Sequence, residues 1–257
     1  MVKLSEITKF LENRFPPEYA EDFDNIGLLA GKAEREVSKV LICLDCTESV
    51  VREAVGIGAE LIITHHPFIF NAIKSVNDFS SLGAAIVLAL ENNISIYSAH
   101  TNLDSAPGGL TDLVVSKLGL TATSNILGNL GRVCTADTTA KSLCNKIKKE
   151  FGVETLFSTF TKDKDIKKVA VCNGGGGGEL AEIAKSMCDV YISGDLKHHE
   201  VLSFAESDAD YIEIKHYDSE FIVTELLKSE LDKKFSDIEI LISRKNTSPL
   251  IDTDKIL

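Results

Sequence analysis

All six histidines of this 257-residue chain lie in short polar clusters, and carboxylate side chains stand within four residues of several of them. The clusters are Thr64-His65-His66-Pro67, His100-Thr101-Asn102-Leu103-Asp104, Lys197-His198-His199-Glu200 and His216-Tyr217-Asp218-Ser219-Glu220. Imidazole is the commonest metal ligand in proteins, and carboxylates share such sites with it. One histidine alone would be interpreted as a hydrogen-bonded core or loop residue, whereas the whole set predicts metal binding.

The clusters also fall where a metal site is expected. Three of them follow apolar runs that predict buried strands, at residues 61–64, 94–98 and 211–214. Ligands of open α/β sheets collect beyond the carboxyl ends of the strands, where loops converge. Because consecutive residues past a strand end point to opposite sides, His65 and His66 can address two different ions.

The expected ligand atoms are nitrogen and oxygen without paired thiolates, which favours Zn²⁺, Mn²⁺ or Fe²⁺ over a cysteine-rich structural zinc site. The chain has enough such side chains for two ions bridged by a carboxylate. Paired ions of this kind activate water and hold a phosphoryl or carbonyl oxygen during hydrolysis. Cys43 and Cys46 form a C-x-x-C pair, but the strand-like run around them favours buried thiols over redox or metal chemistry.

A run of five glycines, Gly174 to Gly178, follows Asn173. Its position between a predicted strand and a predicted helix suits an anion cradle of backbone N–H groups. The run does not continue into the lysine of a P-loop, because Glu179 follows it. The glycines equally suit a tight turn or the close approach of another backbone segment.

The rest of the chain must position these clusters, and it alternates short apolar runs with amphipathic helical patterns. This alternation predicts an α/β fold with largely buried sheets. Helices are predicted near residues 4–11, 47–56, 82–91, 110–118, 143–151, 179–188, 201–205 and 219–235. Further strands are predicted at 40–44, 168–172, 190–193 and 238–242, a junction at 121–135 and a tail at 243–257.

The two halves of the sequence repeat each other weakly. Each half has a strand that ends in cysteine, an acidic residue 17 positions later and a hydroxyl residue 21 positions later. The matching pairs are Cys43 and Cys172, Glu60 and Asp189, and Thr64 and Ser193. The common order of these pairs favours an internal duplication over chance, although α/β units also converge on similar spacings.

Composition limits the kinds of partner. The formal net charge of −12, from 27 basic and 39 acidic side chains, disfavours nucleic acid and anionic membranes. No apolar run approaches the roughly 20 residues that span a bilayer, and the first residues lack a signal-peptide pattern. The modest, dispersed cysteine content is typical of a reducing cytoplasm.

The motifs taken together resemble the NIF-three-like dinuclear metal proteins, which are also called GTP cyclohydrolase I type 2 homologues. The resemblance covers nearly the whole chain. The residues that carry it are Asp24-Asn25-Ile26-Gly27, Leu61-Ile62-Ile63-Thr64-His65-His66-Pro67, His100-Thr101-Asn102-Leu103-Asp104, Ser193-Gly194-Asp195-Leu196-Lys197-His198-His199, and His216 with Glu220.

The resemblance implies a fold of two similar intertwined α/β units, at residues 1–125 and 126–257, with mixed sheets flanked by helices and the metal site in the cleft between them. It implies a ring-shaped homohexamer and two divalent ions per chain. The implied metal ligands are His65, His66, Asp104, His216 and Glu220. Glu220 would bridge the ions, His100 would support a ligand or transfer a proton, and Asp195 and His199 would line the same cleft.

Two further expectations concern how this chain compares with the family pattern. Lys215 stands where a glycine is common before the histidine, so local access or charge can differ. The distance between the two ligand groups implies the short form, without a large inserted domain.

Two functions from different classes follow. The first is a metal-dependent hydrolase of a nucleotide or phosphoester, which the family name would make GTP. The second is a non-catalytic hexameric scaffold or regulatory protein that recruits a protein partner. Nucleic-acid binding is a weaker third hypothesis because of the acidic charge.

Overall fold

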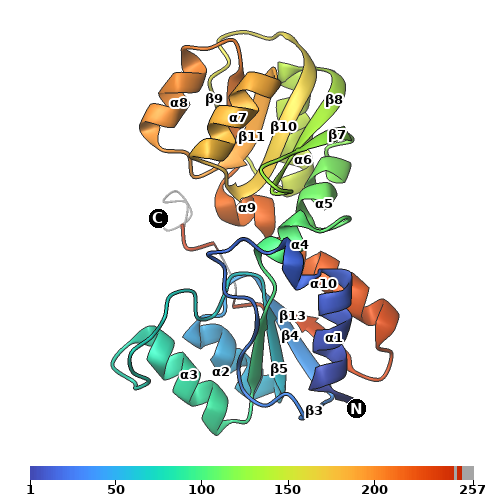
Figure 1. Ribbon diagram of the computed structural model, residues 1–257, viewed down its shortest axis with the longest axis vertical. Coiled ribbons are helices and arrows are strands. Elements are labelled where there is room, and N and C mark those ends of the chain that lie inside the picture. Colours follow the sequence, from blue (N-terminus) through green and yellow to red (C-terminus); the bar gives the residue numbers. More distant parts are fainter. Residues whose placement is uncertain (246–247, 251–257) are drawn as a thin grey trace. The chain divides into compact units, whose positions relative to one another are not determined.

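The computed structural model describes residues 1–245 and 248–250, and the chain divides into two compact units (Figure 1). Unit 1 comprises Met1–Leu103 together with the chain from Val223 onward, and unit 2 is Asp104–Ile222. These bounds differ from the predicted division at residue 125. The difference arises because the chain after residue 103 packs with unit 2 and the last helix and strand return to unit 1.

Unit 1 is built on a five-stranded sheet in the order β13-β4-β5-β6-β2, in which only β2 runs antiparallel to its neighbour. Its strands are β2 (Gly27–Ala30), β4 (Lys39–Cys43), β5 (Leu61–Thr64), β6 (Ser95–Ser98) and β13 (Glu239–Ile242), and a separate pair joins β1 (Val2–Lys3) to β3 (Glu36–Val37). Its helices are α1 (Leu4–Arg14), the 3-10 turn Pro17–Tyr19, α2 (Glu48–Ile57), α3 (Ser81–Glu91) and α10 (Val223–Lys234). The short helix α4 (Thr101–Ser105) crosses from unit 1 into unit 2.

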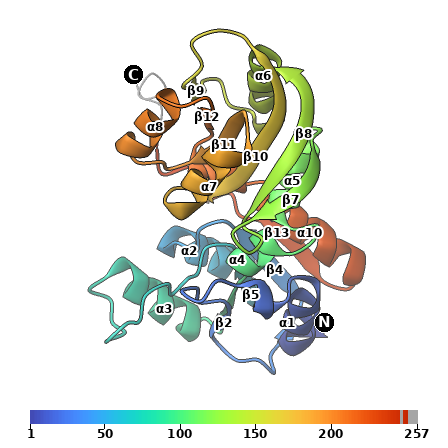
Figure 2. The same ribbon diagram turned by 45° about the horizontal axis from the view of Figure 1, so that its top comes forward.

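Apolar side chains from the helices cover both faces of this sheet. α2 and α3 lie on one face and α1 and α10 on the other (Figures 1 and 2). Val50, Val51 and Ile86 from the first pair of helices pack with Leu41 and Ile62 of the strands, and all five are buried. Strands that are covered on both faces read as continuous apolar runs, which is why their positions were predictable.

Unit 2 contains a six-stranded mixed sheet in the order β7-β8-β10-β11-β12-β9, with β10, β11 and β12 parallel. Its strands are β7 (Thr121–Ile126), β8 (Gly131–Thr139), β9 (Phe157–Ser158), β10 (Asp165–Gly175), β11 (Val190–Gly194) and β12 (Asp210–Glu213). Its helices are α5 (Leu110–Lys117), α6 (Ala140–Phe151), α7 (Glu179–Met187), α8 (His198–Ala205) and α9 (His216–Glu220). Phe204 of α8 packs against Tyr191 of β11 and Tyr211 of β12, with α7 on the same face of the sheet, while α5 and α6 lie across the other face (Figure 2).

Two predicted elements differ from the structure. The predicted junction at 121–135 is the antiparallel hairpin β7–β8. β7 exposes all of its side chains except that of Ile126, so it lacks the apolar alternation that marks a strand. The predicted helix 219–235 is two helices, because the chain leaves α9 after Glu220 and begins α10 at Val223.

In both units a carboxylate at the amino end of one parallel strand accepts hydrogen bonds from backbone N–H groups at the start of the preceding strand. In unit 1 the Glu60 carboxylate accepts hydrogen bonds from the Ser38 and Lys39 N–H groups at 3.1 and 2.9 Å. In unit 2 the Asp189 carboxylate accepts from the Lys167 and Lys168 N–H groups at 2.7 and 2.8 Å. The acid of each repeat thus ties one strand to the start of the preceding strand, as expected for duplicated units.

Two findings remain about the chain as a whole. The predicted tail at 243–257 lies largely outside the described residues, and the described part of it, 243–245 and 248–250, contains no helix or strand. Among the helices that the structure describes, none combines the length and apolar character needed to cross a membrane.

Candidate metal centre

Three of the predicted histidines meet in unit 1, beyond the carboxyl ends of β5 and β6. One ring nitrogen from each of His65, His66 and His100 lies within 4.8 Å of the others. The ring centroids are 5.2 to 5.6 Å apart. His65 is fully buried, whereas His66 and His100 are half-buried, so the group lies at the surface of unit 1 rather than in its core.

Each of these histidines is held through its Nδ1 atom by an oxygen. Nδ1 of His65 donates to the Ala99 carbonyl at 2.9 Å, and because a carbonyl can only accept, the proton is on Nδ1. Nδ1 of His66 lies 2.7 Å from the Asp45 carboxylate. Contacts of this kind fix the tautomer and direct the Nε2 lone pair toward an ion.

His100 is held most extensively. Its Nδ1 lies 2.9 Å from Asp24, whose carboxylate also accepts from the Thr101 N–H and hydroxyl at 3.0 and 2.5 Å. Burial raises the pKa of Asp24. The hydrogen bond and the charge of His100, together with two hydrogen bonds from Thr101, outweigh burial and lower this pKa to about 2. Asp24 is therefore ionised at neutral pH and holds His100 in one orientation.

Two carboxylates meet in unit 2, also at the carboxyl end of its parallel strands. The Asn173 Nδ2 atom donates to Asp104 at 2.9 Å and to Glu220 at 3.3 Å. The Thr111 hydroxyl donates to Asn173 Oδ1 at 2.7 Å, which fixes the amide so that its NH₂ group faces both acids. Asp104, Glu220 and Asn173 are all buried. Burial first, and then the charges of Asp104 and Glu220, raise the pKa of the neighbouring Cys172 to about 12.

His216 completes this second group. Its Nε2 lies 2.9 Å from Glu220 Oε2, and its Nδ1 lies 2.8 Å from the Asp195 carboxylate. Asp195 adopts φ +56°, a left-handed conformation that is uncommon for a residue other than glycine. Lys215 has φ −52°, so the backbone at the position before His216 does not require a glycine.

The glycine run brings the backbone close to these side chains. β10 bulges between its pairs Val171–Ile192 and Gly175–Gly194, and Asn173 and Gly174 lie in that bulge. A Cβ atom on Gly174, which has φ +61°, would come within 2.8 Å of Glu220 Cδ and 3.0 Å of His216 Nε2. At Gly174 the glycine is therefore explained by the close approach of the backbone to Glu220 and His216. Bulges are common beside functional sites.

The anion-cradle interpretation fits less well. The Gly178 N–H at the start of α7 donates to the Glu200 carboxylate at 2.6 Å, and the Lys197 N–H donates to its other oxygen at 2.6 Å. A side chain of the protein thus takes the position that a phosphate would need.

The chemistry of these side chains suits divalent ions. The four histidines His65, His66, His100 and His216 each have an oxygen atom within hydrogen-bond distance of Nδ1. Buried carboxylates such as Asp104 and Glu220 are usually paired with cations or coordinate metals. Mixed imidazole and carboxylate sets suit zinc, manganese and iron.

Not every residue singled out in the sequence joins these groups. His198 and His199 are exposed in the first turn of α8. Cys43 lies in the core and Cys46 packs against it, as the buried-thiol interpretation expected. Sequence reasoning missed the supporting roles of Asp45 and Asn173. Asp45 lies two residues after the end of β4, which is the signal that could have identified it.

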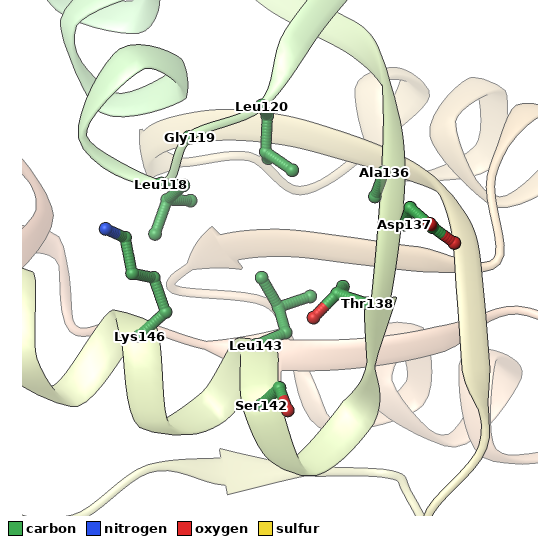
Figure 3. Close-up of a pocket in the computed structure, with 9 residues that line it drawn as sticks. All are labelled: Leu118, Gly119, Leu120, Ala136, Asp137, Thr138, Ser142, Leu143 and Lys146. Atoms are coloured by element: carbon green, nitrogen blue, oxygen red, sulfur yellow. The ribbon is translucent and has the colours of Figure 1, made fainter.

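Unit 2 also contains a pocket of about 300 Å³, which is separate from these groups (Figure 3). Leu118, Leu120 and Leu143 form its apolar part, and Ser142 and Lys146 of α6 stand at its edge. None of the predicted metal ligands lines this pocket.

Comparison with known proteins gives a consistent result over almost the whole chain. The family model described as Duf34/NIF3 (NGG1p interacting factor 3) matches residues 2–249. A Clostridium perfringens protein named GTP cyclohydrolase 1 type 2 homolog is 36% identical, over 96% of this chain and 98% of the relative. NIF3-like protein 1 of Drosophila melanogaster is 31% identical, over 85% of this chain and 78% of its own.

Solved structures agree with the sequence comparison. A hypothetical protein from Staphylococcus aureus has a TM-score of 0.88 and 27% identity, with 97% of this chain and 99% of that chain covered. Reduced HcgD from Methanocaldococcus jannaschii has a TM-score of 0.87 and 30% identity, with 94% and 97% covered. The similarity extends over both units of the chain.

Proposed function

Because the chain belongs to the Duf34/NIF3 family, whose model spans residues 2–249, we propose that it binds two divalent metal ions and hydrolyses a nucleotide or another phosphoester. The observation that carries this proposal is the shared orientation of the histidines, each held at Nδ1 by a carboxylate or carbonyl oxygen. Structural histidines need no such common arrangement, whereas metal ligands almost always have it.

The ligands that we propose are His65, His66, Asp104, His216 and Glu220. Glu220 would be the ligand shared by the two ions; one of its oxygens lies beside His216 Nε2, and the other accepts a hydrogen bond from Asn173. Bound Zn²⁺, Mn²⁺ or Fe²⁺ ions would supply Lewis acidity and activate a water molecule.

The chain's own residues have separable roles in this proposal. Asp45 and Asp195 orient the imidazoles of His66 and His216. Asn173 holds the two buried carboxylates at a common place. His100, whose Nδ1 is held by ionised Asp24, keeps Nε2 for accepting or returning a proton next to the other two histidines.

Metal content is the first test. Protein purified without chelator or histidine tag should contain near two equivalents of metal per chain by elemental analysis. The double variant His216→Ala, Glu220→Gln should contain almost none, and His198→Ala, which changes an exposed histidine outside both groups, should match the parent. No metal in the parent, even after reloading with Mn²⁺, Zn²⁺ or Fe²⁺, would contradict the proposal.

Substrate screening follows metal loading. GTP is the first compound to test because relatives carry the name GTP cyclohydrolase 1 type 2 homolog, with phosphodiesters and small amides beside it. Turnover of any of these should fall strongly in Glu220→Gln. Turnover that equals that of the Glu220→Gln protein would exclude hydrolysis of the compound by this site.

A non-catalytic ring is the second candidate, and exposed apolar side chains favour it. Ile73, Val76 and Phe79 are 39%, 50% and 93% exposed in one loop of unit 1, and surfaces of this kind often join subunits or bind partner proteins. The proposed homohexamer should be visible by sedimentation. A protein partner retained by His66→Ala but lost when the ring is disrupted would support the scaffold function.

A further inference from the structure

Two exposed aromatic rings stand directly beside the histidine group of unit 1. The Phe70 ring centroid is 6.4 Å from that of His100, and the Phe23 centroid is 6.4 Å from that of Phe70, both in edge-to-face geometry. Phe23 is 64% exposed and Phe70 is 47% exposed. Two rings with this much open surface contribute little to the core, and nothing in the proposed metal chemistry uses them.

The loops that carry these rings are anchored rather than loosely attached. Phe68 is buried, and its N–H donates to Ser98 Oγ at 3.2 Å. The Asn25 side chain donates to the Ile69 carbonyl and joins the Phe23 loop to the Phe70 loop. Asp24, the neighbour of Phe23, binds His100 and Thr101. The ring pair is thus held in place relative to the histidines before any ligand arrives.

The charge around the pair limits what it can bind. Phe23 follows the acidic residues Glu21 and Asp22, so a phosphate group would be repelled there. An uncharged planar ring meets no such repulsion. Aromatic side chains stack on the faces of heterocyclic bases, and the interaction does not depend on the identity of the base.

We propose that Phe23 and Phe70 form a stacking platform for the planar heterocycle of the substrate, whose polar part extends toward the histidine group. This inference rests on the proposed function and narrows its substrate class to nucleotides or related heterocyclic compounds rather than simple phosphoesters. The position of Phe70 next to His100 places the heterocycle close to the proposed metal ligands.

The test compares binding of GTP, guanosine and inorganic triphosphate by titration calorimetry on manganese-loaded protein. Stacking is worth about 1–3 kcal/mol per base, so Phe70→Ala should weaken GTP about 5- to 140-fold. Inorganic triphosphate should bind Phe70→Ala as it binds the parent. Phe70→Tyr, which keeps an aromatic ring, should restore GTP binding, and Phe157→Ala, at a 61% exposed residue of β9 in unit 2, should bind GTP like the parent.

The opposite outcomes are equally clear. Equal weakening of GTP and triphosphate, unchanged GTP binding by both Phe70→Ala and Phe23→Ala, or a smaller sedimenting species for Phe70→Ala would overturn the platform. Absence of metal from the parent would count against the proposed function alone, because guanosine binding reports on the platform without metal. Weaker guanosine binding by Phe70→Ala would then still support the platform.

Discussion

Replacing Gly174 by alanine should remove metal from the candidate centre. The backbone strain of this substitution should equal that of Gly152→Ala, because both glycines have a left-handed conformation. Gly174 has φ +61°, and an added Cβ would come within 2.8 Å of Glu220 Cδ and 3.0 Å of His216 Nε2. Gly152 has φ +66° and ends α6, and its Cβ would meet nothing within 4 Å. Gly152→Ala is therefore a matched control that shares the strain and lacks the collision.

Gly174→Ala and Gly152→Ala should differ in stability and in metal affinity. An alanine in the left-handed region costs roughly 1–2 kcal/mol, which lowers Tm by about 2–8 °C for a chain of this size. Gly174→Ala must in addition move the Glu220 carboxylate away from Asn173 and His216, at about 1 kcal/mol for each lost hydrogen bond. A displaced ligand should weaken metal binding by at least the roughly 10–100-fold that loss of a supporting group causes.

The assay is a thermal melt together with a metal titration on parent, Gly174→Ala and Gly152→Ala proteins. We expect Gly152→Ala to keep the metal content of the parent and Gly174→Ala to lose most of it. If both variants bind metal like the parent, Glu220 is not a ligand or has room to move, and the argument from close approach fails.

Three further predictions concern the groups around the site. Asp45→Asn and Asp195→Asn should each weaken metal binding about 10–100-fold without changing the circular dichroism spectrum, and unchanged titration curves would contradict the orienting roles. Thr111→Val removes the donor that fixes the Asn173 amide, so a titration should show weaker metal binding; equal affinity would show that Thr111 does not set the amide orientation. Burial raises the pKa of Glu60, but hydrogen bonds from Lys39 and Ser38 outweigh it and lower that pKa overall. Ionised Glu60 therefore stabilises the fold at neutral pH, and this contribution is lost as the pH falls through the lowered pKa. Denaturation should show Glu60→Gln less stable by about 1 kcal/mol at pH 7, and the difference should vanish as the pH falls through the lowered pKa of Glu60, whereas a pH-independent difference would argue against the linkage.

The elements around the site were predictable because their signals are local. Residues 61–64 form β5 as expected, since a strand buried on both faces is apolar at every position. The α1 helix ends before Pro16, as the proline predicted. Each histidine loop then follows from the strand before it.

The features that the sequence did not predict depend on tertiary contacts or lack a local signal. Exposed β7 has no apolar alternation, and its pairing with β8 is a tertiary interaction that no local pattern displays. The break between Glu220 and Val223 has neither proline nor glycine, so the apolar pattern ran through it. The roles of Asp45 and Asn173 depend on which histidine or carboxylate lies across from them, and a sequence does not give such distances.

The pairing of β13 with β4 has a consequence for how the protein is made. β4 is synthesised before unit 2, but its neighbour at the sheet edge lies 200 residues later in the sequence, with Glu239 opposite Lys39 and Ile242 opposite Ile42. Unit 2 is one continuous segment and can fold on the ribosome while the β4 edge of unit 1 is still unpaired. An exposed strand edge invites pairing with other chains, so the nascent protein has a period of aggregation risk that ends only when β13 emerges. Asp104 and Glu220 of unit 2 can therefore reach their folded positions before the sheet that carries the histidines of unit 1 is complete.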